Sequence, residues 1–203
     1  MNTRSDIINY CISKFRFKDY LEIGVSIGVN IQSINVQNKD GVDPGVGNYS
    51  ELTPLVNYKM TSDDFFDKIK DTEKKYDFIF IDGLHETDQV DKDINNAFKH
   101  LRENGIIMLH DTVPSSFEAQ IVPRTQRRWN GDVWKSVVKI RFNNPNCTVM
   151  TLDLDEGCTL IKRGNQVLYN ETSLDEALKY SYFEQNKVKL LNIVSADYMK
   201  ENI

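Results

Sequence analysis

The hydrophobic positions in the first half of the chain follow two periods, one typical of helices and one typical of buried strands. Apolar side chains recur at helical spacing in residues 3–17, 62–75 and 88–105, and a further helix is expected directly after Gly28. The segment 62–75 begins with a Ser-Asp cap, and Asn104-Gly105 is a typical stop for the segment 88–105. Four helices are therefore expected between residues 3 and 105.

Short apolar runs lie between these helices and predict strands. They are "DYLEIG" at residues 19–24, "KDGVDPG" at 39–45, "YDFIFIDG" at 76–83 and "IIMLHD" at 106–111. The unbroken apolar run Phe78–Ile81 is typical of a central parallel strand that is covered on both faces. Strands that alternate with helices predict an α/β fold with a doubly wound, mostly parallel sheet.

The pattern changes after residue 111. Residues 112–131 are polar and show no period, so we expect a long loop, which in a compact domain is typically functional or disordered. Residues 132–141 have helical spacing, 147–163 predict two strands around "DEG", and 165–203 predict one or two helices. We expect a single domain over residues 1–203, with an N-terminal helix (1–17), a core (18–163) and a helical tail (164–203).

The composition narrows the class of protein. The 203 residues are 40% hydrophobic and carry a net charge of -5, which argues against nucleic-acid binding through bulk electrostatics. No apolar run approaches the roughly 18–20 residues of a membrane span, and Asp6 and Asn9 interrupt the segment where a signal peptide would be apolar. The three cysteines are too few and too scattered for a disulfide framework or a zinc site. We expect a cytoplasmic protein without membrane insertion.

Polar side chains collect where the predicted strands end. The first strand is followed by Glu22, Gly24, Ser26 and Gly28, the second by Asp43, the third by Asp82–Glu86, and the fourth by His110, Asp111 and Thr112. In open parallel sheets, ligands bind beyond the carboxyl ends of the strands. We therefore expect the functional site at this edge.

The turn after the first strand does not have the spacing of a dinucleotide site. In G-x-G-x-x-G, the second glycine lets a pyrophosphate approach the backbone, whereas Ser26 stands there in this chain. Glu22, just before the turn, would also repel a phosphate. A nucleoside with a cationic or zwitterionic tail fits better, with Asp43 placed to accept from both ribose hydroxyls. The alternative is that the glycines only allow a helix to pack closely on the strand.

The motifs "YLEIGVSIG", "GVDP", "YDFIFIDGLH" and "LRENGIIMLHDT" together resemble those of class I S-adenosylmethionine-dependent methyltransferases. The chain is most similar to the subgroup with D-G-x-H after the family's fourth strand, which includes macrocin-type sugar O-methyltransferases. In this chain the motif is Asp82–His85. The resemblance covers residues 17–163 and implies a Rossmann-like sheet of seven strands with an antiparallel final hairpin.

The resemblance also implies which residues bind S-adenosylmethionine. Glu22, Gly24, Ser26 and Gly28 would line the methionine end, together with Asp82, and Asp43 would hold the ribose. Ser62 and Asp63 would lie near the adenine, with helix capping as the alternative role for both.

His85 is the candidate general base, beside Asp82 at the end of the third strand. An alcohol is a weak nucleophile until its proton is taken, and a histidine with a pKa near neutrality is suited to take it. The alternative is that His85 only caps the helix that follows.

A divalent metal ion is a second hypothesis. Related sugar O-methyltransferases use such an ion, and Asp82 and Asp111 could bind Mg²⁺ or another cation, with His110 as a third ligand. Those enzymes have a pair of acidic residues where this chain has His110-Asp111. An imidazole in place of a carboxylate favours a softer ion or no ion. Without a metal, His110 is a candidate acid/base group or substrate contact.

The loop 112–131 and the segment "WNGDVWK" are expected to form the wall of the acceptor site. Trp129 and Trp134 are candidates for stacking on a sugar ring, and Asp132 and Lys135 for binding its hydroxyls. Burial in the core is the alternative for each tryptophan.

These features predict a methyltransferase that acts on a hydroxyl of a sugar or glycan. The alternatives are a non-glycan small-molecule O-methyltransferase, an NAD(P)-dependent oxidoreductase, which the missing middle glycine disfavours, and a non-enzymatic binding module. The sequence leaves open the acceptor, a homo-oligomeric state, and whether the chain acts within a larger glycosyltransferase system.

Overall fold

The computed structural model describes residues 1–45 and 54–203. The elements follow in the order α1 (Arg4–Phe15), β1 (Asp19–Ile23), α2 (Val29–Ser33), β2 (Asn38–Val42), α3 (Ser62–Ile69), β3 (Tyr76–Ile81), α4 (Thr87–His100), β4 (Leu101–Leu109), the 3₁₀ helix η1 (Glu118–Gln120), α5 (Trp134–Asn143), β5 (Cys147–Leu152), β6 (Cys158–Arg163), α6 (Leu174–Ala177), α7 (Tyr180–Leu190) and α8 (Ala196–Asn202). Within the described ranges, no helix has both the length and the apolar character needed to cross a membrane.

The chain divides into two compact units. The first unit comprises Met1–Leu84 and Gln89–Met108, and the second comprises His85–Asp88 and Leu109–Ile203. One boundary lies just after β3 and the other at the end of β4, so the polar residues that follow these strands are divided between the two units. The single domain expected from the sequence stays a prediction.

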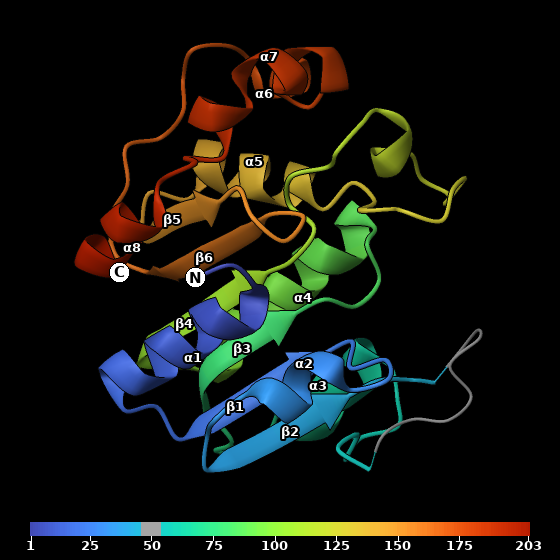
Figure 1. Ribbon diagram of the computed structural model, residues 1–203, viewed down its shortest axis with the longest axis vertical. Helices are drawn as coiled ribbons and strands as arrows, with labels where there is room; N and C mark the ends of the chain where they lie inside the picture. Colours follow the sequence, from blue (N-terminus) through green and yellow to red (C-terminus); the bar gives the residue numbers. More distant parts are fainter. Residues whose placement is uncertain (46–53) are drawn as a thin grey trace. The chain divides into compact units, whose positions relative to one another are not determined.

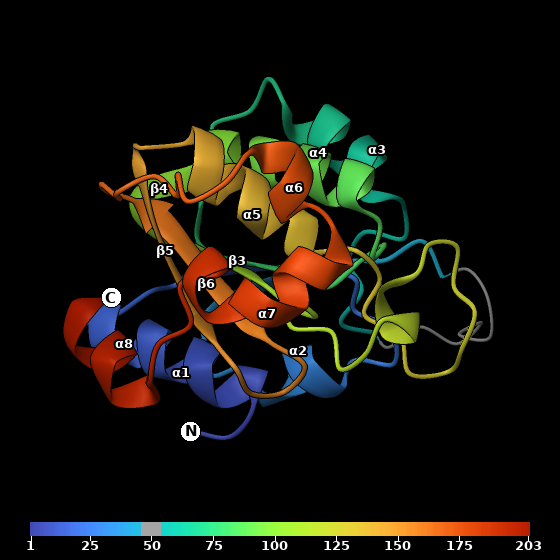
Figure 2. The ribbon, with the colours of Figure 1, turned by 90° about the horizontal axis from the view of Figure 1, so that it is seen from above.

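In the first unit, helices cover both faces of the strands, which lie in the order β2-β1-β3-β4. Helices α1 and α2 lie on one face, and α3 and α4 lie on the other (Figures 1 and 2). Strand β1 is parallel to β2 and to β3, with Ile23 in register with Val42 and Ile81. The residues that follow, Gly24, Asp43 and Asp82, therefore leave the sheet at the same edge, as the pattern of strand ends predicted.

The fourth strand is longer than expected. The helix predicted for 88–105 ends at His100, and β4 begins at Leu101. Arg102, at the start of β4, forms ion pairs with Asp19 (2.7 Å) and Asp77 (3.2 Å), which lie at the starts of β1 and β3. The predicted stop at Asn104-Gly105 is wrong, since Gly105 lies inside the strand.

The described residues contain six strands, not the seven implied by the resemblance. In the part of the chain that the structure describes, Val42 at the end of β2 forms an isolated parallel bridge with Tyr58. After this bridge the chain turns at Met60, and α3 begins at Ser62 with Thr61 as its cap.

The second unit contains the antiparallel hairpin β5–β6, in register from Cys147 opposite Arg163 to Leu152 opposite Cys158. This agrees with the two strands predicted for residues 147–163. Helix α5 packs against α6, and α6 against α7. The tail forms three short helices rather than one or two. The chain thus has a Rossmann-like α/β fold with mostly parallel strands and an antiparallel C-terminal hairpin, as predicted.

Candidate active site

The turn after β1 has an unusual backbone at three alternate residues. Gly24 (φ 85°), Ser26 (φ 51°) and Gly28 (φ 85°) all have left-handed dihedral angles. This conformation favours glycine, which is present at two of the three positions. Asp43 fixes this turn, because its carboxylate accepts from the backbone N–H of Ser26 (2.7 Å) and of Gly45 (2.7 Å). Asp43 therefore shapes the turn predicted to hold the cofactor, and its contact with a ribose stays a prediction.

Glu22 is the centre of a buried network in the first unit. Its side chain is 1% exposed, and Oε2 accepts from the hydroxyl of Tyr20 (2.5 Å) and from Nδ2 of Asn30 (2.8 Å). Oδ1 of Asn30 in turn accepts from the hydroxyl of Ser5 (2.8 Å). Burial raises the pKa of Glu22 to about 7, and the two hydrogen bonds limit the rise.

The sequence interpretation missed Tyr20 and Asn30. Tyr20 stands two residues before Glu22 in β1, so both side chains lie on the same face of the strand. The two-residue period of a strand could therefore have predicted this neighbour. Asn30 is a buried polar residue in α2, and its amide meets Glu22 only because α2 packs on this strand.

Ser62 and Asp63 join two helices of the first unit. Nε2 of Gln89 donates to Oγ of Ser62 (3.2 Å) and to Oδ1 of Asp63 (2.9 Å). The cap of α3 is Thr61, whose hydroxyl accepts from the N–H of Asp64, so the cap predicted to begin at Ser62 lies one residue earlier. Contact of Ser62 and Asp63 with adenine stays a prediction.

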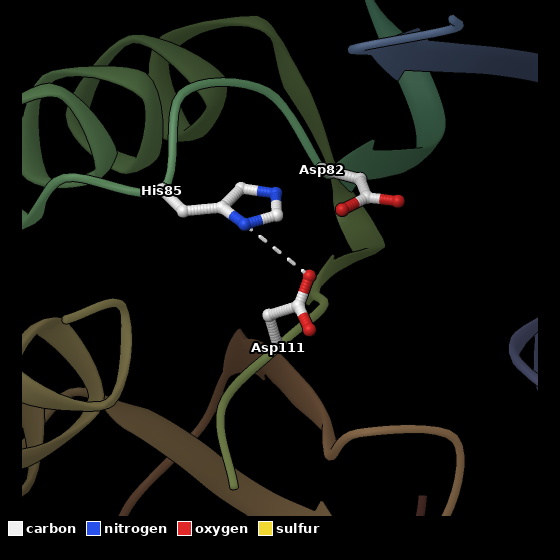
Figure 3. A group of neighbouring side chains, drawn as sticks. All are labelled: Asp82, His85 and Asp111. Atoms are coloured by element: carbon white, nitrogen blue, oxygen red, sulfur yellow. Dashed lines mark ion pairs between the residues drawn. The ribbon is translucent and has the colours of Figure 1, made fainter. Parts of the chain in front are cut away.

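The second unit pairs the candidate base with a carboxylate. Nδ1 of His85 lies 3.4 Å from Oδ2 of Asp111, and the second ring nitrogen, Nε2, lies on the side of the ring away from Asp111 (Figure 3). Asp111 is 7% exposed and has a left-handed backbone (φ 58°), a conformation that is rare outside glycine and often marks a functional position. Figure 3 also draws Asp82, whose N–H donates to the carbonyl of Ile23 (2.8 Å) where β3 ends.

Nitrogen atoms surround the carboxylate of Asp111. Nδ1 of His110 lies 3.1 Å from Oδ2, the oxygen that also faces His85. Nδ2 of Asn130 donates to Oδ1 at 2.5 Å. Each oxygen of Asp111 thus faces at least one nitrogen atom.

The contacts of Asp111 bear on the predicted Mg²⁺ site. A hard cation would need the lone pairs of Asp111 that now face Asn130 and the two histidines. His110 turns Nδ1 towards the carboxylate instead of standing beside it as a second ligand, and its Nε2 lies 3.8 Å from Oδ1 of Asp155. Metal binding by Asp82, His110 and Asp111 stays a prediction.

The predicted acceptor residues have different surroundings. Trp134 is fully buried and packs on Phe183, with 4.3 Å between ring centroids, so in this structure its ring is part of the core. Trp129 stacks on the ring of His85, with centroids 5.5 Å apart and an angle of 18° between the planes. Asp132 and Lys135 pair with each other at 3.0 Å and line a cavity of about 330 Å³.

The three residues that follow His85 in the sequence, Glu86–Asp88, line this cavity. Its wall includes Glu86, Asp88, Asp132, Lys135, Lys139 and Leu178. Two hydrogen bonds of Thr87 build one side of it, from N–H to Oδ1 of Asp132 (2.7 Å) and from the hydroxyl to the carbonyl of Asp132 (2.6 Å). The cavity is lined by both acidic and basic side chains.

Comparison with known proteins agrees with this fold. A family model described as a methyltransferase domain matches residues 21–112. No curated protein matches the chain.

Solved structures of methyltransferases have a similar fold. An O-methyltransferase from Bacillus cereus in complex with SAH is 15% identical with a TM-score of 0.57, covering 79% of this chain and 80% of the other. The SAH-bound methyltransferase PaMTH1 from Podospora anserina is 16% identical with a TM-score of 0.58, covering 81% and 80%. TomG from Streptomyces achromogenes, an O-methyltransferase of tomaymycin synthesis in complex with SAM, is 13% identical with a TM-score of 0.55, covering 80% of each chain. The Rossmann-like fold is therefore confirmed, and residues 21–112 are similar to a methyltransferase domain.

Proposed function

We propose that the chain is an S-adenosylmethionine-dependent O-methyltransferase that acts on a hydroxyl of a sugar or glycan, with His85 as general base. The observation that carries the proposal is the pair of His85 and Asp111, 3.4 Å apart, within the region 21–112 that matches a methyltransferase domain. The SAM- and SAH-bound proteins of similar fold support the choice of methyl donor.

Removal of a proton from an alcohol needs a basic nitrogen and a group that orients it, and His85 and Asp111 are residues of these two types. Asp111 orients His85 through Nδ1–H, so that Nε2 takes the hydroxyl proton. The separation of 3.4 Å is long for a hydrogen bond, and such contacts commonly shorten when the substrate binds. S-adenosylmethionine supplies a methyl group on positively charged sulfur. The carbon–oxygen bond forms as the carbon–sulfur bond breaks, and the electron pair of the broken bond stays on sulfur.

The network around Glu22 supports the binding of the methionine end. An ammonium group is the partner that a buried carboxyl favours, because the opposite charge offsets the cost of desolvation. Tyr20 and Asn30 hold one oxygen of Glu22 in place at 2.5 and 2.8 Å and so fix the direction of the carboxyl group before a cation arrives.

The cavity lined by Glu86, Asp132 and Lys135 supports a hydroxyl-rich acceptor. Its acids and lysines offer many hydrogen-bond partners, and at least one of them, Lys135, is already neutralised by Asp132. A flat aromatic acceptor would leave these polar groups without partners, at a cost for each one that is desolvated.

Incubation with methyl-labelled S-adenosylmethionine and a panel of glycans and phenolic small molecules tests the proposal. Label in a glycan ether is the expected result, and label only in phenols selects the small-molecule alternative. Calorimetry with S-adenosylmethionine and with NAD separates the methyltransferase from the oxidoreductase, since tight binding of NAD alone contradicts the proposal.

A further inference from the structure

Four consecutive residues of the second unit, Trp129–Asp132, each contact His85 or Asp111. The ring of Trp129 stacks on the ring of His85, and Nδ2 of Asn130 donates to Oδ1 of Asp111 at 2.5 Å. The N–H of Asp132 donates to the carbonyl of His85 at 3.1 Å. Gly131 lies against the same carbonyl. One short segment thus touches both the ring and the backbone of the proposed base, and its carboxylate partner.

Hydrogen bonds to Ala119 and Ile121 hold the segment 129–132 in place. Nε1 of Trp129 donates to the carbonyl of Ile121 at 2.6 Å. The carbonyl of Ala119, in η1, accepts from the N–H of Asn130 (2.9 Å) and of Gly131 (3.1 Å). The 3₁₀ turn in the predicted long loop therefore anchors the residues that face His85.

Gly131 is the position with the least freedom. Its φ of 64° is left-handed, and a Cβ built on it would stand 1.8 Å from the carbonyl oxygen of His85. A distance this short cannot be relieved by a side-chain rotation, because the neighbouring atom is backbone. Any side chain at residue 131 must therefore displace either this segment or His85.

Asn130 is arranged at a cost to stability. It is 1% exposed, and its amide NH₂ points at two carboxylates, Oδ1 of Asp111 and Oε2 of Glu156 (3.3 Å). Among the residues that the structure describes, its Oδ1 has no hydrogen-bond partner. A buried acceptor without a partner is unfavourable, so packing alone does not explain an asparagine here.

We propose that Trp129, Asn130 and Gly131 are positioning residues for His85 and Asp111. The inference rests on the proposed function, in which His85 is the base. Trp129 fixes the plane of the imidazole ring, Gly131 fixes the backbone of His85, and Asn130 orients the carboxylate of Asp111. The stacking face of Trp129 is then used by the enzyme itself and not by a sugar ring.

The test compares the whole chain with the variants Trp129→Ala, Trp129→Phe, Asn130→Ala and Gly131→Ala. Thr125→Ala, at an exposed residue of the same loop, is the matched control. Only three histidines are present, so labelled histidine gives three sets of ring signals in NMR spectra. The stacked indole ring of Trp129 shields the ring protons of His85 in the NMR spectrum. His100, which is hydrogen-bonded to the carbonyl of Lys74, reports the fold of the first unit.

Two results are expected. Trp129→Ala and Gly131→Ala should shift the His85 signals while His100 is unchanged, and Trp129→Phe should restore most of the shift. With a glycan acceptor, Trp129→Ala, Asn130→Ala and Gly131→Ala should lower kcat by about 100-fold with KM for S-adenosylmethionine within about twofold, and Trp129→Phe should recover most of kcat.

Unchanged His85 signals in folded Trp129→Ala and Gly131→Ala protein overturn the inference, whatever the reaction is. Unchanged kcat in all three variants overturns it as well. Failure of the proposed function has a different signature, namely His85 signals that move as expected together with full turnover of His85→Ala.

Discussion

The α-carbon of Gly24 lies directly against the carbonyl of Asp82, so that a Cβ on Gly24 would stand 2.1 Å from that oxygen. The contact joins the turn after β1 to the end of β3, next to the hydrogen bond from the N–H of Asp82 to the carbonyl of Ile23 (2.8 Å). The first glycine of the G-x-x-x-G motif is therefore required by backbone packing within the first unit, before any cofactor is considered.

Gly24→Ala should destabilise the protein strongly. The substitution combines a collision with the backbone and a left-handed φ of 85°, so we expect a loss of about 2–4 kcal/mol in the free energy of unfolding. Gly83→Ala is the matched control, because a Cβ there would meet only a methyl group at 3.4 Å. Urea unfolding of both variants measures the difference, and equal midpoints would contradict the prediction.

The stability of the protein should fall as the pH rises from about 5 to 8. The pKa of Glu22 is raised from 4.5 to about 7, mainly by burial, so the folded state holds this proton more tightly than the unfolded state. The resulting stabilisation is complete below pH 4.5 and is lost as the pH rises through about 7, a change on the order of 3 kcal/mol.

Glu22→Gln removes this titration and should flatten the curve of unfolding free energy against pH. Asp93, whose pKa burial raises to about 6, acts in the same direction at lower pH, so Asp93→Asn should be measured beside it. A wild-type curve that is flat from pH 5 to 8 would count against both assignments.

Removal of the base or of its carboxylate should stop the chemistry and spare cofactor binding. His85→Ala and Asp111→Asn are each expected to lower kcat by about 10²–10⁴-fold, because an alcohol that keeps its proton is a weak nucleophile. Calorimetry with S-adenosylhomocysteine should give a Kd within about threefold of the wild type if only general-base catalysis is removed. Turnover of His85→Ala close to that of the wild type would exclude the base assignment.

EDTA should leave the activity unchanged. The lone pairs of Asp111 face Nδ2 of Asn130 at 2.5 Å and Nδ1 of His110 at 3.1 Å, so the carboxylate already has partners other than a metal ion. Initial rates before and after chelation measure this. Loss of activity that added Mg²⁺ restores would return Asp111 to the role of metal ligand predicted from the sequence.

Much of the fold could be predicted because local patterns determine it. The apolar run of β3 and the spacing of α1 are properties of short segments, and both elements lie where the sequence placed them. The predictions failed where a distant contact decides the structure. At the start of β4, Arg102 pairs with the distant residues Asp19 and Asp77, and Tyr58 forms an isolated bridge with Val42.

The sequence by itself determined which polar residues stand at the strand ends, including Glu22, Asp43, His85 and Asp111, since strand ends follow from the hydrophobic pattern. Only the tertiary structure showed that Asp111 faces His85 and that Asn130 and Gly131 contact this pair. The physical reason is that the 129–132 segment belongs to a loop with no period. Its course depends on hydrogen bonds to Ala119 and Ile121, which no spacing in the sequence encodes.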